Sequence, residues 1–246
     1  MNIEERNMKI FGQQIKDSVD NNDLINIRNF EVFNIFQDEC LYVFDFNSNK
    51  IVYNRGFKNL LGYSDDEITF DFIIRNIHPD EAEIVSRIIR AAVVYCLENP
   101  KNSSNNLLTM KYRRKRIDGT YIHILSQSSI YERGENGEIS KSLARLIDIS
   151  FIDNDENINW TFNATNLNKK AFRQKINNVY ADFFTKREVE IIFKIEKGLT
   201  NKLIGENLKI SVLTVATHRK NILKKSNCHH SNDLIRFCKE IGVLNN

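Results

Sequence analysis

Basic and hydrogen-bonding side chains recur at helical spacing in LTNKLIGENLKISVLTVATHRKNILKKS, the segment from Leu199 to Ser226. Within it, residues 201–226 carry six Lys and Arg against the single acid Glu206, a net charge of +5. Two apolar-periodic stretches, NKLIGENL and LTVATHRKNILKK, are separated only by KIS. Residues 1–150, in contrast, have a net charge of −3. This contrast indicates that the C-terminal part of the chain meets a polyanion.

The second stretch predicts a helix with two distinct sides. At about 3.6 residues per turn, Val215 and Ile222 lie together on an apolar side. The opposite side, an arc of roughly 60°, contains Leu213, Thr217, Lys220 and Lys224, with Asn221 flanking it. This face suits contacts with base edges, surrounded by lysines that reach phosphates. Because an ordinary solvated helix face has a similar composition, this pattern alone leaves both interpretations open.

Capping residues place this helix in a four-helix unit. Thr185 stands three residues before Glu188, the spacing of a capping box. Further N-caps are predicted at Thr200 and Ser211, and Gly198 and Gly242 are predicted to follow helix ends. The last helix of the unit is predicted at about residues 231–240.

The motifs TKREVEII, KGLTNKLIGENLKIS, TVATHRKNILKK and GVL resemble the LuxR-type (NarL/FixJ-like) helix-turn-helix domain of bacterial transcriptional regulators. The resemblance covers about 60 residues and implies an all-α, four-helix DNA-binding domain at residues 181–246. It also implies that Val215 and Ile222 lie in the core and that His218 is structural. The residues predicted to face DNA, from the resemblance and the helical face together, are Lys202, Thr214, Ala216, Thr217, Lys220, Asn221 and Lys224.

The segment departs from the family pattern at several positions. Ala216 replaces a common lysine, which removes one cationic contact. Gly205 replaces an alanine, for an expected cost of up to about 1 kcal/mol in helix stability. Ser226 stands where an apolar leucine is common. The DNA sequence that is recognised is therefore not transferable from relatives.

The preceding part of the chain reads as an α+β domain. Short strands are predicted at 40–46 and 50–54, helices follow, and further strands are predicted at 107–116, 120–131 and 141–150. The phrases YVFDFNSNKIVYNRGFKNLLGYSDDEI, IHPDE, YRRKRIDGTYIHILSQSSIYERGENGEI and LIDIS resemble the PAS sensor family in this order. The resemblance implies a five-stranded antiparallel sheet in the order 2-1-5-4-3 with flanking helices.

The predicted organisation has four parts. Residues 1–35 form an N-terminal helical segment, in which Ile10, Phe11, Ile15 and Val19 make an apolar stripe. The PAS-like sensor domain follows at 36–151, then an Asn-rich connector at 152–180, whose residues 169–180 are candidates for a helix. The helix-turn-helix domain ends the chain at 181–246.

The basic run KYRRKRID predicts a strand with charge on both faces. Alternation directs Lys111, Arg113 and Lys115 to one side, and directs Met110, Tyr112 and Arg114 to the other. We expect an edge-protecting or partner-facing strand, because charges discourage stray pairing. A second nucleic-acid site is the alternative.

The residues predict no catalytic site and no metal site. No Walker loop, HExxH motif or nucleophile elbow is present, so the chain is not expected to be an enzyme. The segment CHH at 228–230, followed by Cys238, matches none of the usual zinc spacings. The cofactor is predicted to be none, although a small-molecule ligand of unknown identity in the sensor domain stays open. YNRGFKNLLG lacks the cysteine of flavin photoreceptors, and the candidate haem ligands are His78 and His123.

Scattered cysteines and the lack of a secretory signal or membrane span predict a cytoplasmic protein. The resulting interpretation is a bacterial transcriptional regulator in which a PAS-type sensory or dimerisation domain controls a LuxR-type helix-turn-helix. Its predicted partners are double-stranded DNA, a second copy of the chain in a homodimer, and RNA polymerase as a further candidate. The alternatives are an adaptor whose helical domain docks on another regulator without binding DNA, and a chromophore-bearing sensor.

Overall fold

The computed structural model describes residues 35–102, 105–153 and 157–244. Its contacts divide the chain into a unit that ends at Leu167 and a unit that begins at Asn168. The apolar stripe predicted at the N-terminus lies outside the described residues.

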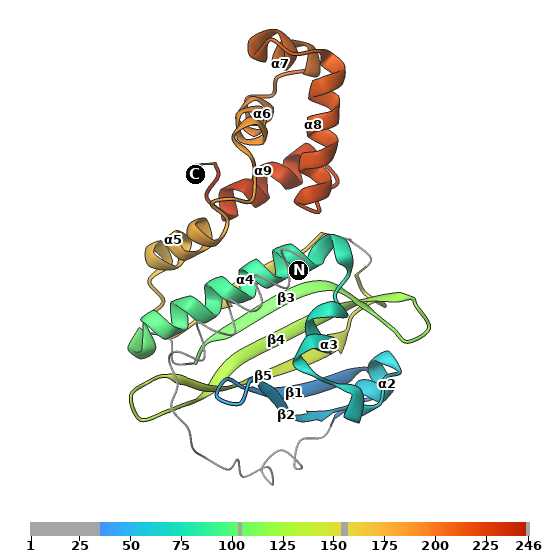
Figure 1. The fold of residues 1–246 in the computed structure, drawn as a ribbon, viewed down its shortest axis with the longest axis vertical. Coiled ribbons are helices and arrows are strands. Elements are labelled where there is room, and N and C mark those ends of the chain that lie inside the picture. Colours follow the sequence, from blue (N-terminus) through green and yellow to red (C-terminus); the bar gives the residue numbers. More distant parts are fainter. Residues whose placement is uncertain (1–34, 103–104, 154–156, 245–246) are drawn as a thin grey trace. The chain divides into compact units, whose positions relative to one another are not determined.

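An antiparallel sheet forms the body of the first unit (Figure 1). Its strands are β1 (Glu39–Asp45), β2 (Lys50–Arg55), β3 (Leu107–Lys115), β4 (Tyr121–Arg133), β5 (Ile139–Asp148) and β6 (Asn159–Asn163). They lie in the order β2-β1-β5-β4-β3-β6, and every neighbouring pair is antiparallel. The predicted order 2-1-5-4-3 is confirmed. The prediction of five strands is wrong, because β6 adds a sixth from the segment expected to be a connector.

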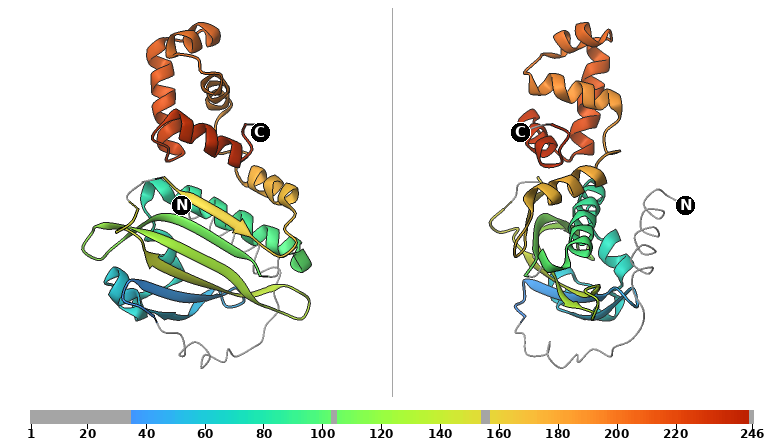
Figure 2. Two further views of the ribbon diagram at one scale, coloured as in Figure 1. Left: turned by 180° about the vertical axis from the view of Figure 1, so that it is seen from behind. Right: turned by 90° about the vertical axis from the view of Figure 1, so that its left-hand side faces the viewer.

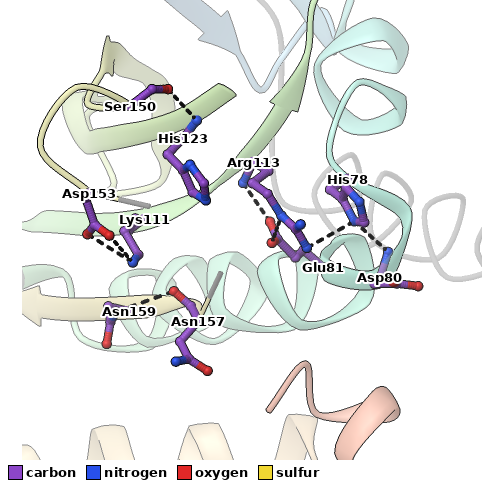
Figure 3. Close-up of polar contacts among 10 residues, drawn as sticks. All are labelled: His78, Asp80, Glu81, Lys111, Arg113, His123, Ser150, Asp153, Asn157 and Asn159. Atoms are coloured by element: carbon purple, nitrogen blue, oxygen red, sulfur yellow. Dashed lines mark hydrogen bonds and ion pairs between the residues drawn. The ribbon is translucent and has the colours of Figure 1, made fainter. Parts of the chain in front are cut away.

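β3 has neighbours along both of its sides, so the prediction that it protects an edge is wrong. β6 pairs with the first half of β3. The segment before α4 covers the second half, where the Lys115 N–H donates to the Asn76 carbonyl at 3.0 Å. Lys111 is only 5% exposed, and its Nζ forms an ion pair with Asp153 at 3.0 Å (Figure 3). Lys111, Arg113 and Arg114 therefore have partners inside the unit, whereas Lys115 is exposed.

Helices cover one face of the sheet. They are α2 (Phe57–Leu61), α3 (Phe70–Arg75) and α4 (Pro79–Glu98), with 3₁₀ turns at Asp65–Glu67 and Pro100–Asn102. The views from the front and from behind place α3 and α4 on the same face (Figures 1 and 2). Tyr95 of α4 packs against Phe162 of β6 with ring centroids 5.9 Å apart. The apolar side chains of the covered face, such as Ile124 and Leu146, are fully buried and form the core.

Polar contacts fix the start of α4 against β3 (Figure 3). Pro79 occupies the first helical turn, where a backbone N–H has no partner within the helix. The N–H that proline lacks therefore costs the helix no hydrogen bond. The His78 Nδ1 accepts a hydrogen bond from the Asp80 N–H at 3.3 Å. Glu81 is buried, and it accepts from both the backbone N–H and the Nε of Arg113 at 2.6 Å each. His78 is therefore the N-cap of α4.

The second unit is all-helical. It contains α5 (Lys169–Val179), α6 (Lys186–Glu196), α7 (Asn201–Leu208), α8 (Val212–Lys225) and α9 (Ser231–Glu240). The predicted capping box is present, since Thr185 accepts from the Glu188 N–H and Glu188 accepts from the Thr185 N–H. Tyr180, Phe183 and Phe237 form an aromatic cluster with centroid distances between 5.2 and 5.9 Å. The four helices α6 to α9 confirm the predicted helix-turn-helix domain, and α5 precedes them.

Candidate nucleic-acid interface

A tight turn joins α7 to α8. Lys209 adopts a left-handed backbone with φ of 53°, and the Ile210 N–H donates to the Gly205 carbonyl at 3.0 Å. A Cβ added to Gly205 would lie 2.8 Å from the Ile210 carbonyl oxygen. Gly205 was predicted only as a cost to the helix. Its lack of a side chain also lets the turn approach the helix closely, which the helical pattern could not reveal.

The first turn of α8 is capped by Ser211. Its Oγ accepts from the Thr214 N–H at 3.0 Å and lies 2.8 Å from the Thr214 Oγ1. Ser211 therefore satisfies one of the four backbone N–H groups that a helix start leaves unpaired. Thr214, which was predicted to face DNA, is exposed, but its hydroxyl also contacts the cap.

Two buried residues fix the rotation of α8. Val215 and Ile222 have no exposed surface, as their predicted core positions require. The residues on the opposite side of the helix, Leu213, Thr217, Lys220 and Lys224, are all exposed. We call these four residues the α8 outer row. Spacings of three and four residues put successive members of the row one above another along the helix.

Thr217 presents a particular combination of groups within the α8 outer row. Its Oγ1 donates to the Leu213 carbonyl one turn earlier, at 3.0 Å. The hydroxyl proton is thus used within the helix, so the exposed part of the side chain is an acceptor oxygen and a methyl group. Both groups match features of base edges in the major groove, where amino donors and the thymine methyl are displayed.

The other predicted site residues lie at the margin of the α8 outer row or on α7. Asn221 is exposed beside the row, whereas Ala216 is half-buried. Lys202 is exposed on α7. His218 is half-buried on α8, and no role in binding is assigned to it.

Two further cations of α8 are used inside the domain. The Arg219 Nη2 donates to the Ser231 Oγ at 2.9 Å, which connects α8 to α9. The Lys225 Nζ pairs with Glu188 at 3.1 Å and lies 5.6 Å from the Phe183 ring centroid. In the described part of the chain, no ion pair involves Lys220 or Lys224. Their charges therefore stay directed to solvent.

Leu213 belongs to the α8 outer row but is missing from the predicted site residues. It is 77% exposed, and its neighbour Val212 is 50% exposed. The helical wheel placed Leu213 on the outer face, yet it was not selected as a candidate. Its place on the helical wheel, opposite Val215 and Ile222, is the signal that could have identified it.

No group of three metal-ligating side chains occurs among the residues that the structure describes. Cys228 and Cys238 are both buried, and His229 and His230 are exposed. Burial raises the pKa of the Cys228 thiol to about 11, so it is protonated near neutral pH.

His123, the other haem-ligand candidate, lies on β4 in the first unit (Figure 3). Its backbone N–H donates to the Ser150 Oγ at 3.0 Å. Its Nε2 is enclosed and makes no hydrogen bond within the described residues. The position alone does not select a cofactor.

Comparison with known proteins identifies both units. The family of bacterial regulatory proteins named luxR matches residues 182–238, and the PAS fold matches residues 50–144. The uncharacterized response regulatory protein YgeK of Escherichia coli K12 is 42% identical over 72 residues, which are 28% of this chain and 49% of that protein. The transcriptional regulatory protein LiaR of Bacillus subtilis 168 is 58% identical over 41 residues, or 17% of this chain and 19% of LiaR.

Among solved structures, the VqmA dimer of Vibrio cholerae is similar to this chain, with 17% sequence identity and a TM-score of 0.36. The alignment covers 90% of this chain and 89% of the VqmA chain. The chain spans about half of YgeK and about a fifth of LiaR. Residues 182–238 therefore belong to the LuxR family of bacterial regulatory proteins, and residues 50–144 belong to the PAS fold.

Proposed function

We propose that this chain is a DNA-binding transcriptional regulator in which a PAS-type sensory or dimerisation domain controls a LuxR-type helix-turn-helix. The observation that carries the proposal is the α8 outer row. It combines two lysines that form no ion pair with a described residue, an acceptor oxygen and a methyl group at Thr217, and an exposed leucine. Buried residues fix the helix that presents them. Such a helix places short side chains against base edges and longer cations against phosphates.

The chain binds DNA as a homodimer in this proposal. One helix-turn-helix reads a single half-site, and a two-fold dimer reads two half-sites about one DNA turn apart. The VqmA structure is described as that of a dimer, which agrees with this assembly. RNA polymerase is the further partner that a transcriptional regulator of this kind contacts.

The PAS-fold unit supplies the regulation by binding a small molecule or by pairing with a second copy. The proposed regulator acts in the cytoplasm and has no catalytic activity. The structure contains, among its described residues, no helix long and apolar enough to cross a membrane. A LuxR-type domain and a PAS-fold domain, in a sequence with no recognised catalytic motif, support a regulator rather than an enzyme.

Fluorescence-anisotropy titration of the full chain with mixed genomic duplex DNA at several salt concentrations tests the proposal. We expect affinity to fall steeply as salt rises, because bound lysines release counterions from DNA. Residues 181–246 titrated alone would show whether the PAS-fold unit restrains or assists binding. Absence of binding by both proteins at low salt would contradict the proposal and favour the adaptor function, with the α8 outer row as a protein-docking face.

A further inference from the structure

Arg114 is a cation enclosed in the first unit. Its side chain is 1% exposed and is among the largest fully buried side chains of the described residues. Alternation along β3 places it on the same face as Tyr112 and Met110, which are also buried. Burying a guanidinium is costly unless an anion and hydrogen bonds compensate its charge.

The hydrogen-bond partners of Arg114 are neutral. Its Nη1 donates to the Ile73 carbonyl at 2.8 Å, and its Nη2 donates to the Tyr112 hydroxyl at 3.0 Å. The Ile73 carbonyl belongs to the last turn of α3, where a cation is favourable but only partly compensated. The Nε is enclosed and makes no hydrogen bond to any residue that the structure describes. Within the described ranges, no carboxylate forms an ion pair with Arg114.

The two ionisable side chains of β1 that act on Arg114 supply no negative charge either. Cys40 and Tyr42 of β1 are close enough to interact electrostatically with Arg114. Burial raises the pKa of the Cys40 thiol and of the Tyr42 phenol far above neutral, so both groups stay protonated. The guanidinium therefore has a full positive charge, and among the described residues no anion bonds to it.

A second unpartnered polar atom lies on the same face of the sheet. Asn54 pairs directly with Tyr42 across β2 and β1, so the two side chains project to one side. The Asn54 Oδ1 is enclosed and makes no hydrogen bond in the described part of the chain. The interior of this unit thus holds both a donor and an acceptor that the described residues leave unbonded.

We propose that Arg114 anchors the carboxylate of a small organic acid in the interior of the PAS-fold unit. The Nε–H and a neighbouring Nη–H form the planar edge with which arginine holds a carboxylate through two parallel bonds. Such an anion supplies the charge that Ile73, Tyr112, Cys40 and Tyr42 do not provide. The inference deepens the sensory role proposed above, because it names the ligand class that the PAS-fold unit takes.

Thermal unfolding of the full chain at neutral pH and constant ionic strength provides the test. The probes are propionate and propionamide, which have similar shapes but differ in charge. We expect propionate to raise the Tm in a saturable manner and propionamide to leave it unchanged. Equal effects of the two probes, or no effect of propionate, would overturn the proposal. An equal rise in Tm with chloride or inorganic phosphate would show that the site takes any anion rather than a carboxylate, and would also overturn the proposal.

Variants separate a ligand anchor from a structural arginine. Arg114→Met removes the charge and keeps an elongated side chain, and we expect it to abolish the propionate effect. In the absence of probe its Tm is expected to equal or exceed that of the parent, since an uncompensated buried charge is removed. A lower Tm together with an undiminished propionate effect would show that Arg114 only supports α3.

The matched control is Arg116→Gln. The Arg116 side chain is 39% exposed and pairs with Asp148 at 2.8 Å, so this variant should keep the propionate response. If Arg114→Met does not fold, Arg114→Lys keeps the charge without the two parallel bonds, and at least a tenfold weaker propionate affinity is expected. An unchanged affinity in Arg114→Lys would contradict the proposal. DNA titration of the same samples reports on the proposed function separately, so the two failures are distinguishable.

Discussion

Lys225 at the end of α8 pairs with Glu188 in the first turn of α6, with 3.1 Å between the Lys225 Nζ and the Glu188 Oε2. The same carboxylate accepts from the Thr185 N–H at 2.7 Å, so one side chain caps α6 and holds α8. Lys224, the preceding residue, points to solvent instead. Two adjacent lysines thus have different tasks, one in the stability of the domain and one on its outer face.

Glu188→Gln is expected to lower the free energy of unfolding of the chain by about 0.5–1 kcal/mol near neutral pH. Burial alone raises the pKa of Glu188, but hydrogen bonds from Thr185 and Lys225 outweigh it and lower the pKa below the ordinary value. Because the pKa of Glu188 is lower in the folded state, its carboxylate adds to the free energy of unfolding at pH values above its unfolded-state pKa of about 4.3. This contribution is lost as the pH falls through the folded-state pKa. Urea unfolding across this range should therefore show parent and variant converging at low pH. A difference that persists at low pH would contradict the ion pair as its cause.

Phe162→Ala should destabilise the first unit by about 3 kcal/mol, because the ring is buried against Tyr95. Thr161, the preceding residue of β6, is exposed and provides the matched control. Thr161→Ala is expected to change stability by less than about 0.5 kcal/mol. Chemical denaturation of both variants measures the difference. Equal, small effects would show that β6 adds nothing to the folded sheet.

Thr217→Val should change base preference without weakening unspecific binding. The substitution keeps the branched shape and a methyl group but removes the acceptor oxygen. Selection of preferred duplexes from a random pool, with parent and variant in parallel, measures the change. We expect altered preference at one or two positions in each half-site, at a cost of about 1–3 kcal/mol for the parental base. An identical preference would exclude the Thr217 oxygen from base recognition.

Leu213 is expected to contact a thymine methyl, since an apolar side chain on the outer row matches the apolar group of that base. Replacing each thymine of the selected duplex by deoxyuridine removes the methyl alone. At one position the parent should lose about 1 kcal/mol of binding free energy, and Leu213→Ala should lose nothing further there. Additive losses at every position would place Leu213 away from the bases.

The helix-turn-helix domain could be predicted from the sequence because its signals are local. Thr185, Thr200 and Ser211 each accept from an N–H of the helix that follows, and the apolar spacing places Val215 and Ile222 in the core. The separate tasks of Lys224 and Lys225 were not predictable, since they depend on Glu188, which is distant in sequence.

The parts of the first unit that were missed depend on pairing over long distances. β6 is short and polar, and its partner β3 ends more than 40 residues earlier in the chain. Alternation along β3 correctly placed the side chains of Arg113 and Arg114 on opposite faces of the sheet. It could not predict that α3 covers the face on which Arg114 lies. Which face of a strand is covered follows from tertiary packing rather than from its own sequence.

The most direct test of the central claim is the salt dependence of DNA binding by Lys220→Ala and Lys224→Ala compared with Lys225→Ala. We expect each of the first two variants to make the slope of log affinity against log salt shallower by about 1, because each lysine contacts one phosphate. Lys225→Ala should lower stability and leave the slope unchanged, since its charge is held by Glu188. Unchanged slopes for Lys220→Ala and Lys224→Ala, in protein that still binds DNA, would contradict the assignment of the α8 outer row as the DNA-binding face.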